Sequence, residues 1–306
     1  MKVDGAILTT DLAQVGEAAQ QLERLGYAGA FSFDGPGDPF SPLLLAATHT
    51  ERIELLTAVA IAFARNPMLV AQTAHDLQRL SRGRFLLGLG SQIRPHVERR
   101  FSMPWSRPVE RMREFVLAVR AIWDAWETGD KLAFRGEFYR HTLMTPFFNK
   151  GPQPDGAPPI LLAGVGPRMT AVAGEVADGF LLHPLNTPRF VDEVTRPALA
   201  RGRQLAARSP SAPFQMGCQV LVASGPDAES RAAARAAVRA QIAFYASTPA
   251  YRVVLECEGW EGLQPELHRL SKRGDWAEMT ARVPDAVLET VAVCGEIGRA
   301  SCRERV

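Results

Sequence analysis

The stretch "RFLLGLGSQ" (residues 84–92) decides between two α/β folds. It is an apolar run closed by Gly88 and Gly90. A dinucleotide-binding fold would continue to a third glycine, as G-x-G-x-x-G leading into a helix, with an acidic residue about 20 positions later. Position 93 is Ile instead. The glycine pair therefore does not predict a dinucleotide-binding turn, and alone it is weak evidence for any ligand.

Strand and helix patterns alternate on both sides of this stretch. Strands are expected at residues 3–8, 28–33, 53–61, 84–90, 159–164, 179–184 and 214–224. Helices are expected at 12–27, from 42, from 67, and at 109–126, 167–177, 188–207 and 226–245. This alternation predicts a parallel sheet, because a right-handed crossover lays each helix back on the sheet. Seven uniform pairs over about 250 residues favour a closed (β/α)8 TIM barrel over an open doubly wound sheet.

Composition and charge limit the class of partner. Of 306 residues, 46% are hydrophobic, which suits one large domain or two small ones with a sizeable core. The formal net charge is only +2, so neither nucleic acid nor an anionic membrane is favoured. No 18 apolar residues follow one another, and the segment before the first strand is too short for the apolar region of a signal peptide, so none is expected. We expect a cytoplasmic protein with a small-molecule partner.

The four cysteines lie far apart in the sequence. They are Cys218, Cys257, Cys294 and Cys302, with no C-x-x-C pair and no Cys/His cluster at metal-ligand spacing. We expect reduced thiols and no metal site.

A barrel of this kind carries its active site at the C-terminal ends of the strands. The residues expected there are Asp34, Ala58 to Ile61, Gly90 to His96, Gly164 to Gly166 and His183. The backbone N–H groups of Gly164 to Gly166, before Pro167, could cradle a phosphate, or the glycines could form an ordinary turn. Asp34 could equally cap a turn, and Arg94 and His96 could lie in a solvated basic loop.

Other polar segments have simpler explanations. His49 and His75 fall inside helical segments, and His268 lies in a polar late helix, so all three are interpreted as structural. The arginines of "RAAARAAVRA" (231–240) have helical spacing and indicate a solvated helix face rather than a nucleic-acid site.

Several blocks together resemble the luciferase-like monooxygenase superfamily. They are "LSRGRFLLGLGSQ", "RMREFVLAVRAIW", "PPILLAGVGPRMTAVAGEVADGFLLHP" and "IELLTAVAIAFARNP", and the likeness spans residues 3 to 295. Within it, "HVERRFSMPWSRPVERMREF" (96–115) and "FRGEFYRHTLMTPFF" (134–148) resemble the branch of oxidoreductases that depend on the deazaflavin coenzyme F420. The resemblance implies one barrel domain over residues 1–295, with an insert at about 130–158, that holds a flavin or deazaflavin in its mouth.

The resemblance also implies roles for individual residues. The cofactor-binding set is Ala58, Val59, Gly90, Ser91, Gln92, Gly164, Val165, Gly166 and His183. In this set, the residues up to Gln92 border the ring and the later ones hold the phosphate. A non-proline cis peptide is implied at Ala58–Val59. The implied chemistry is hydride transfer to or from the deazaflavin.

Catalytic and substrate-binding residues follow from the same resemblance. The expected proton donor is His96 or His183, with Asp34 near the ring. Arg94 and Arg140 are expected anion partners, and Phe63 and Trp105 are expected to line an apolar substrate pocket. The sugar-phosphate dehydrogenases of the family carry a histidine and an acid where this chain has Gly35 and Ile93, which argues against that substrate.

Two other functions stay open. The same scaffold could bind FMN and act as a monooxygenase, or it could be a barrel without cofactor that binds a metabolite or serves as an inactive partner subunit. Association into a homodimer also stays open. The segment "EIGRASCRERV" (296–306) can be back-translated from a sequencing adapter and is expected to lie outside the native fold. The chain is accordingly expected to lack the last strand and helices of the barrel.

Overall fold

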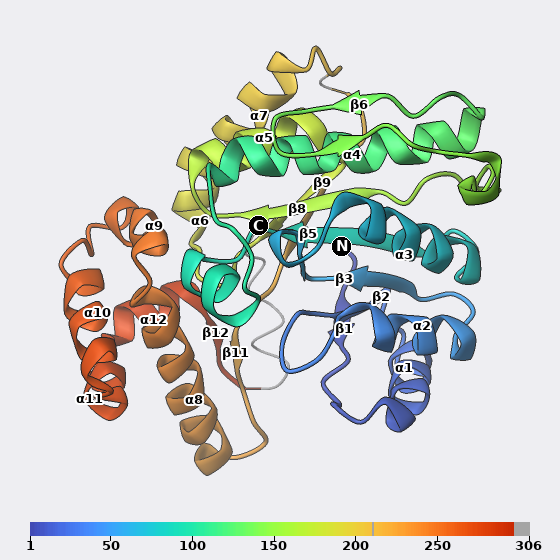
Figure 1. The fold of residues 1–306 in the computed structure, drawn as a ribbon. Helices are drawn as coiled ribbons and strands as arrows, with labels where there is room; N and C mark the ends of the chain where they lie inside the picture. Colours follow the sequence, from blue (N-terminus) through green and yellow to red (C-terminus); the bar gives the residue numbers. More distant parts are fainter. Residues whose placement is uncertain (210, 297–306) are drawn as a thin grey trace. The chain divides into compact units, whose positions relative to one another are not determined.

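Seven strands, taken in chain order, form the main sheet of the computed structural model, which describes residues 1–209 and 211–296 (Figure 1). They are β1 (Asp4–Ala6), β2 (Gly29–Ser32), β3 (Glu54–Thr57), β5 (Phe85–Gly90), β8 (Ile160–Gly164), β9 (Gly179–Leu182) and β10 (Gln215–Cys218). The short strand β4 (Ala60–Ile61) pairs with β5, beside this path. The pairs from β1 to β8 are parallel.

The strand order separates the two folds that the sequence left in competition. The strands lie side by side in the order β1-β2-β3-β5-β8-β9-β10, so their order in the sheet follows their order in the chain. A doubly wound sheet would reverse its order near the middle, whereas a (β/α)8 barrel winds in one direction. The predicted barrel architecture is therefore confirmed.

Helices follow the strands at nearly all of the predicted positions. They are α1 (Val15–Arg24), α2 (Phe40–His49), α3 (Pro67–Leu80), α4 (Pro108–Thr128), α5 (Pro167–Val176), α6 (Pro188–Phe190), α7 (Arg196–Leu205) and α8 (Ala228–Ala246). Four more follow: α9 (Arg252–Cys257), α10 (Leu263–Arg273), α11 (Trp276–Ala281) and α12 (Asp285–Val291). The two remaining small sheets pair β6 (Phe134–Arg135) with β7 (Arg140–His141), and β11 (Val222–Ala223) with β12 (Val293–Cys294).

Three predicted elements differ in detail from the structure. Helix α2 begins at Phe40 rather than residue 42, because the Asp38 carboxylate accepts the backbone N–H groups of Phe40 and Ser41 at 3.0 and 2.9 Å. The helix predicted at 188–207 contains a π-helical turn at Val191–Thr195. The strand predicted at 214–224 is broken between β10 and β11.

The strand predicted at 53–61 is also divided, into β3 and β4. Leu56 is paired with Leu86, and Ala60 with Leu89, so three residues on one strand oppose two on the other. Gly88 lies opposite this bulge. A Cβ atom at Gly88 would lie 1.8 Å from the Thr57 carbonyl oxygen. This glycine is required because the two backbones approach too closely for any side chain.

The chain divides into two compact units. Of the described residues, the first comprises 1–163, 172–181 and those within 205–215, and the second comprises 164–171, 182–204 and those from 216 onward. Inside the first unit, Leu56, Leu86 and Leu161 of neighbouring strands pack together. The second unit has a core of buried apolar side chains from α8 to α12, and Leu185 belongs to it. Because the chain divides into two units, the single barrel domain expected from the sequence stays a prediction.

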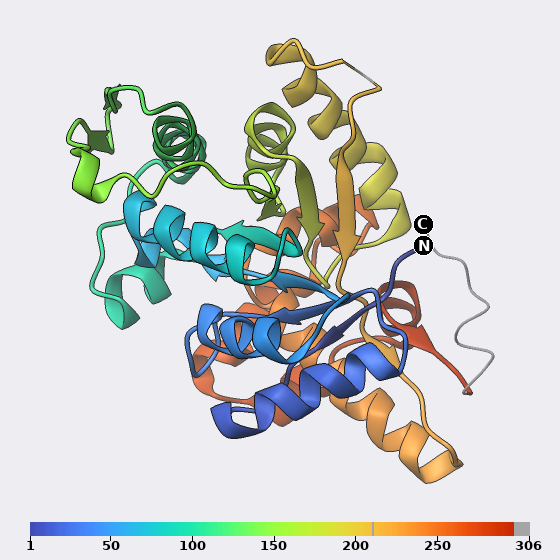
Figure 2. The same cartoon turned by 90° about the vertical axis from the view of Figure 1, so that its right-hand side faces the viewer.

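The predicted insert belongs to the first unit. It contains the β6–β7 hairpin, in which Phe134 is paired with His141, and the chain then returns past α4 to β8 (Figure 2). The predicted non-native tail, 296–306, falls outside the described residues from 297 onward.

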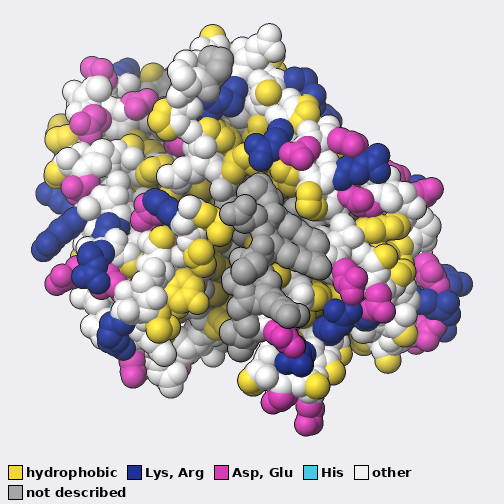
Figure 3. Space-filling model, turned by 180° about the vertical axis from the view of Figure 1, so that it is seen from behind, with side chains coloured by type: hydrophobic (Ala, Val, Ile, Leu, Met, Phe, Trp, Pro, Cys, Tyr) yellow, Lys and Arg dark blue, Asp and Glu magenta, His cyan; other side chains and the backbone are white. Residues whose placement is uncertain are grey.

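Surface and chain properties agree with a protein of mixed charge. No helix among the described residues is long and apolar enough to cross a membrane. On the face drawn in Figure 3, basic and acidic side chains are interspersed. Among the described residues, Cys218, Cys257 and Cys294 are not joined in a disulfide.

Candidate functional site

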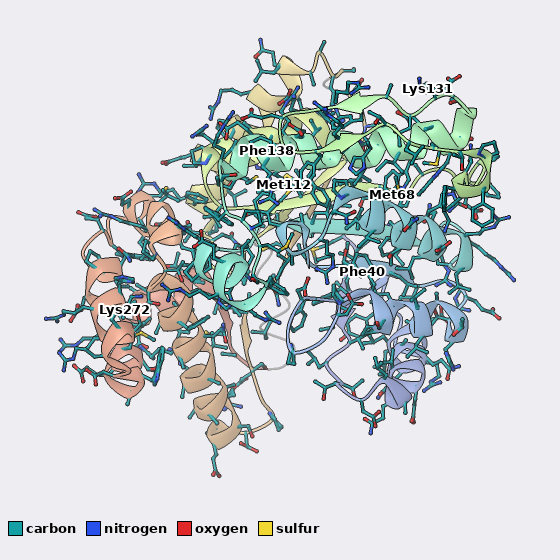
Figure 4. The ribbon with its side chains drawn as sticks, in the orientation of Figure 1. Phe40, Met68, Met112, Lys131, Phe138 and Lys272 are labelled. Atoms are coloured by element: carbon teal, nitrogen blue, oxygen red, sulfur yellow. The ribbon has the colours of Figure 1, made fainter. Side chains whose placement is uncertain are left out.

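Asp34, at the end of β2, has a carboxylate that accepts hydrogen bonds from two other residues. Its Oδ2 accepts a hydrogen bond from the Ile61 backbone N–H at 2.7 Å and from Arg65 Nη1 at 2.6 Å. The Asp34 side chain is only 5% exposed. Arg65 also contacts Asp38 at 3.0 Å and lies over the ring of Phe40, which is labelled in Figure 4. This arrangement fixes the turn after β3 to the end of β2.

The cis peptide implied by the resemblance is present between Ala58 and Val59. The Ala58 N–H donates to the Ser32 carbonyl at 2.7 Å, and the Asp34 N–H donates to the Val59 carbonyl at 3.0 Å. A Cβ atom on Gly90 would lie 2.7 Å from Val59 Cγ2. Gly90 therefore leaves room for the Val59 side chain, and the first unit brings these predicted ring-bordering residues together.

The loop after β5 holds the other predicted residues of the first unit. Gln92 has a φ of 60°, and its side-chain oxygen accepts the Ile93 N–H at 3.0 Å. Arg94 pairs with Glu98 on the next helical turn at 3.0 Å. His96 is exposed at the start of a π-helical turn, His96–Arg100. Arg94 and His96 are therefore both open to solvent, whereas Gln92 is partly buried.

The predicted apolar wall contains an arginine that was not predicted. Phe63 is fully buried, and its ring lies 5.6 Å from that of Trp105. The guanidinium of Arg111 lies 4.6 Å from the centroid of Phe63 and donates to Tyr139 Oη at 2.8 Å. Arg140, one residue further on, is exposed. A charged group buried against aromatic rings is thus part of this wall.

In the second unit, the Gly164 to Gly166 turn leads into α5. The Gly166 carbonyl accepts the Thr170 N–H at 3.1 Å, so the first turn of the helix begins here. A Cβ atom on Gly166 would meet nothing within 4 Å. The helix start and the open space beside Gly166 form a surface that suits an anion.

His183 follows β9 and lies among neutral groups of the same unit. Its ring centroid is 4.2 Å from that of Tyr251 and 4.6 Å from that of Tyr245. The Leu185 N–H donates to His183 Nδ1 at 3.0 Å, so the single proton of the neutral ring is on Nε2. Burial lowers the pKa of His183 to about 4. At neutral pH this ring is therefore a hydrogen-bond donor and carries no charge.

Two titratable groups in the surroundings of His183, Tyr251 and Cys218, are neutral at pH 7 as well. Burial raises the pKa of Tyr251 to about 12, and burial raises the pKa of the Cys218 thiol. Asn186 connects the cluster, because its side-chain N–H group donates to the His183 carbonyl at 2.7 Å and to Cys218 Sγ at 3.3 Å. A neutral cluster of this type suits binding rather than nucleophilic attack.

Sequence reasoning missed Arg65, Arg111, Tyr245 and Tyr251. The need for a residue such as Arg65 could have been inferred, since a buried aspartate at a strand end requires a cationic or N–H partner. The two tyrosines had none, because they lie more than sixty positions after His183. Among the described residues, no group of three His, Cys, Asp or Glu side chains is arranged to hold a metal ion.

Comparison with known proteins agrees with the predicted family. The family model described as luciferase-like monooxygenase matches residues 2–306. An uncharacterized protein of Mycobacterium tuberculosis is 54% identical over 297 residues, which cover 97% of this chain and 87% of that protein. A putative coenzyme F420-dependent oxidoreductase of the same species is 28% identical over 92% of this chain and 83% of its own length.

A solved structure shows the same fold. The coenzyme F420 dependent tetrahydromethanopterin reductase of Methanopyrus kandleri matches with a TM-score of 0.78 and 20% sequence identity. The match covers 98% of this chain and 87% of that protein. At this level of identity the likeness concerns the fold.

Proposed function

Because this chain belongs to the luciferase-like monooxygenase family, we propose that it is an oxidoreductase that transfers a hydride between coenzyme F420 and a small, largely apolar substrate. The observation that carries the cofactor assignment is the relative named as a putative coenzyme F420-dependent oxidoreductase, which is similar over 92% of the chain. Bound F420 would supply the hydride-carrying C5 position of its deazaflavin ring.

The residues of each unit fit such a cofactor. In the second unit, Gly166 has open space where any other residue has a Cβ atom, and the start of α5 offers backbone N–H groups to a phosphate. His183 adds a neutral Nε2–H donor nearby in sequence. In the first unit, Ala58, Val59 and Gly90 form a close-packed apolar backbone surface that would border the ring.

We assign different roles to the three predicted catalytic residues. His183 would bind, since a ring with a pKa of about 4 does not carry an exchangeable second proton at neutral pH. His96 is the remaining proton donor, because its ring is exposed at the loop after β5. Asp34 would position the Ala58–Val59 turn through Ile61 and Arg65 and would not take part in proton transfer.

For the substrate, we retain the predicted apolar wall and add Arg111 to it. Phe63 is fully buried beneath this guanidinium, so Trp105, which is partly exposed, would make the direct contact. Arg94 and Arg140 are both exposed and remain the proposed partners of an anionic group on the substrate.

The proposal is tested by titrating the purified protein with F420 and with FMN and following the fluorescence of each. We expect tighter binding of F420 and no oxygen consumption that depends on a reduced cofactor. Tighter binding of FMN, with oxygen uptake in the presence of substrate, would favour a monooxygenase, which the name of the family also suggests. Failure to bind either cofactor would overturn the proposal in favour of a cofactor-free barrel.

A further inference from the structure

One guanidinium of the first unit is buried without a carboxylate partner. Arg111 lies in the first turn of α4 and is only 6% exposed. Its Nε donates to Tyr139 Oη at 2.8 Å, and its Nη1 donates to the Pro104 carbonyl at 2.5 Å. Met112 and Phe138, labelled in Figure 4, mark the parts of α4 and of the β6–β7 hairpin that carry these two side chains. Among the residues that the structure describes, Arg111 forms no ion pair, although a buried charge normally has a partner.

The carboxylates closest to Arg111 along the chain do not neutralise it. Glu114, on the next turn of α4, accepts three backbone N–H groups from the turn between β6 and β7, at 2.6 to 2.8 Å. Glu137, in that turn, is paired with Arg107. Glu110 is the neighbour of Arg111 in the helix, and adjacent helical residues do not face each other. The charge of Arg111 is therefore left for an anion from outside the chain.

Two hydrogen-bond donors of this cluster lack an acceptor. Within the described part of the chain, Arg111 Nη2 has no partner, yet this atom retains solvent-accessible surface. Tyr139 Oη accepts the Arg111 Nε–H and keeps its own hydrogen at pH 7, because burial raises the pKa of Tyr139. A guanidinium edge beside a hydroxyl is a set of donors that suits the two oxygens of a carboxylate.

The surroundings of the guanidinium are aromatic. Its central carbon lies 4.6 Å from the ring centroid of Phe63 and 5.6 Å from that of Tyr139. Trp105 follows Pro104, whose carbonyl Arg111 holds, and the Trp105 ring lies 5.6 Å from that of Phe63. The guanidinium and the partly exposed Trp105 therefore pack on the same aromatic ring. An anion bound here would meet a charged group and an apolar surface together.

We propose that Arg111 and Tyr139 anchor a carboxylate of the substrate, whose apolar body packs against Trp105. The substrate is thus a small apolar carboxylic acid, an inference that rests on the proposed oxidoreductase function. Arg94 and Arg140 are exposed, so water and salt screen their charges. They would attract the anion from solvent, whereas the buried guanidinium would hold it by charge-assisted hydrogen bonds.

The test uses the full chain without cofactor and benzoate as the probe, at pH 7.5, with benzamide as a neutral molecule of the same shape. The chain has five tryptophans, and Trp105→Phe identifies the Trp105 indole N–H signal in the NMR spectrum. We expect a saturable shift of that signal with benzoate and at least tenfold weaker binding of benzamide. Because no cofactor is present, this result does not depend on whether F420 binds.

Three variants make the test specific. Tyr139→Phe removes one hydroxyl, keeps the ring that packs 5.5 Å from that of Phe115, and should weaken benzoate binding at least fivefold. Arg111→Lys keeps the charge but lacks the planar pair of N–H groups, and should weaken binding at least tenfold. Arg135→Met removes an exposed cation of the same hairpin and should change binding by less than about twofold. Unchanged positions of the other indole signals check that each variant is folded.

Several outcomes would overturn the proposal. They are a shift that does not saturate up to about 50 mM benzoate, equal binding of benzamide, or equal effects of Tyr139→Phe and Arg135→Met. Repeating the titration with saturating F420 separates substrate from cofactor. Undiminished binding supports a substrate anchor, whereas displacement of benzoate would assign Arg111 to an anionic group of the cofactor. Binding of benzoate by a protein that binds neither F420 nor FMN would keep the carboxylate site and overturn the proposed function alone.

Discussion

His183 should make the stability of the folded protein depend on pH in a defined window. Burial lowers its pKa from 6.5 to about 4 in the folded state. One unit of difference between the folded and unfolded pKa is worth about 1.4 kcal/mol, so the contribution reaches about 3 kcal/mol. Below about pH 6.5, the unfolded chain takes up a proton at His183 more readily than the folded chain does. The contribution is therefore complete above about pH 6.5 and is lost as the pH falls toward 4.

Two measurements on the same variant check this magnitude. The chain has six histidines, so His183→Gln identifies one Hε1 signal, whose titration gives the folded pKa directly. Urea unfolding from pH 4 to 7.5 then compares the wild type with His183→Gln, which keeps a polar side chain but cannot titrate. The difference in unfolding free energy between the two proteins should change by about 3 kcal/mol between pH 4 and 6.5. A His183 midpoint near 6.5, or parallel curves for His183→Gln, would refute the reasoning.

Three further outcomes are expected. Gly166→Val should raise the dissociation constant of F420 at least tenfold, about 1.4 kcal/mol, whereas Gly262→Val, at another helix start with open space, should not change it; equal affinities in a fluorescence titration would contradict the phosphate assignment. Asp34→Asn removes the buried member of the ion pair with the partly buried Arg65 and should lower the unfolding free energy in urea by about 3 kcal/mol. Asp38→Asn, on the exposed side of the same arginine, should lower it by less than about 1 kcal/mol, and the prediction fails if the two variants are equal. His96→Ala should slow hydride transfer to the eventual substrate by roughly 10²- to 10⁴-fold with unchanged F420 affinity, and a wild-type rate would remove His96 from the mechanism.

The fold was largely predictable because periodicity and strand ends are local signals. The apolar run at 84–90 became β5 (Phe85–Gly90), and the Pro67 start of α3 is a helix signal that acts within one turn. The break between β3 and β4 was not predictable from periodicity. It depends on the close approach of Gly88 to Thr57, which lies 31 positions away in the chain.

The candidate site was predictable in position but not in chemistry. Strand ends located Asp34 and His183, because every strand end of a barrel faces the same edge. Whether each residue is free to react depends on its neighbours in space. Arg65 and Ile61 occupy the Asp34 carboxylate, and two distant tyrosines surround His183. The roles of Asp34 and His183 therefore depend on contacts in space that the sequence does not reveal.

Comparison of His75 with His183 shows why burial alone does not identify a functional histidine. Burial lowers the pKa of both rings, so both are neutral at pH 7. His183 has Nδ1 bonded to the Leu185 N–H, which fixes the proton on Nε2 and prepares a donor of known position. His75 lies inside α3 instead, and its buried ring packs against Trp126 with 5.2 Å between the ring centroids. The two buried rings therefore differ in their surroundings: His75 packs against an aromatic ring inside a helix, whereas His183 presents a donor of fixed position at a strand end.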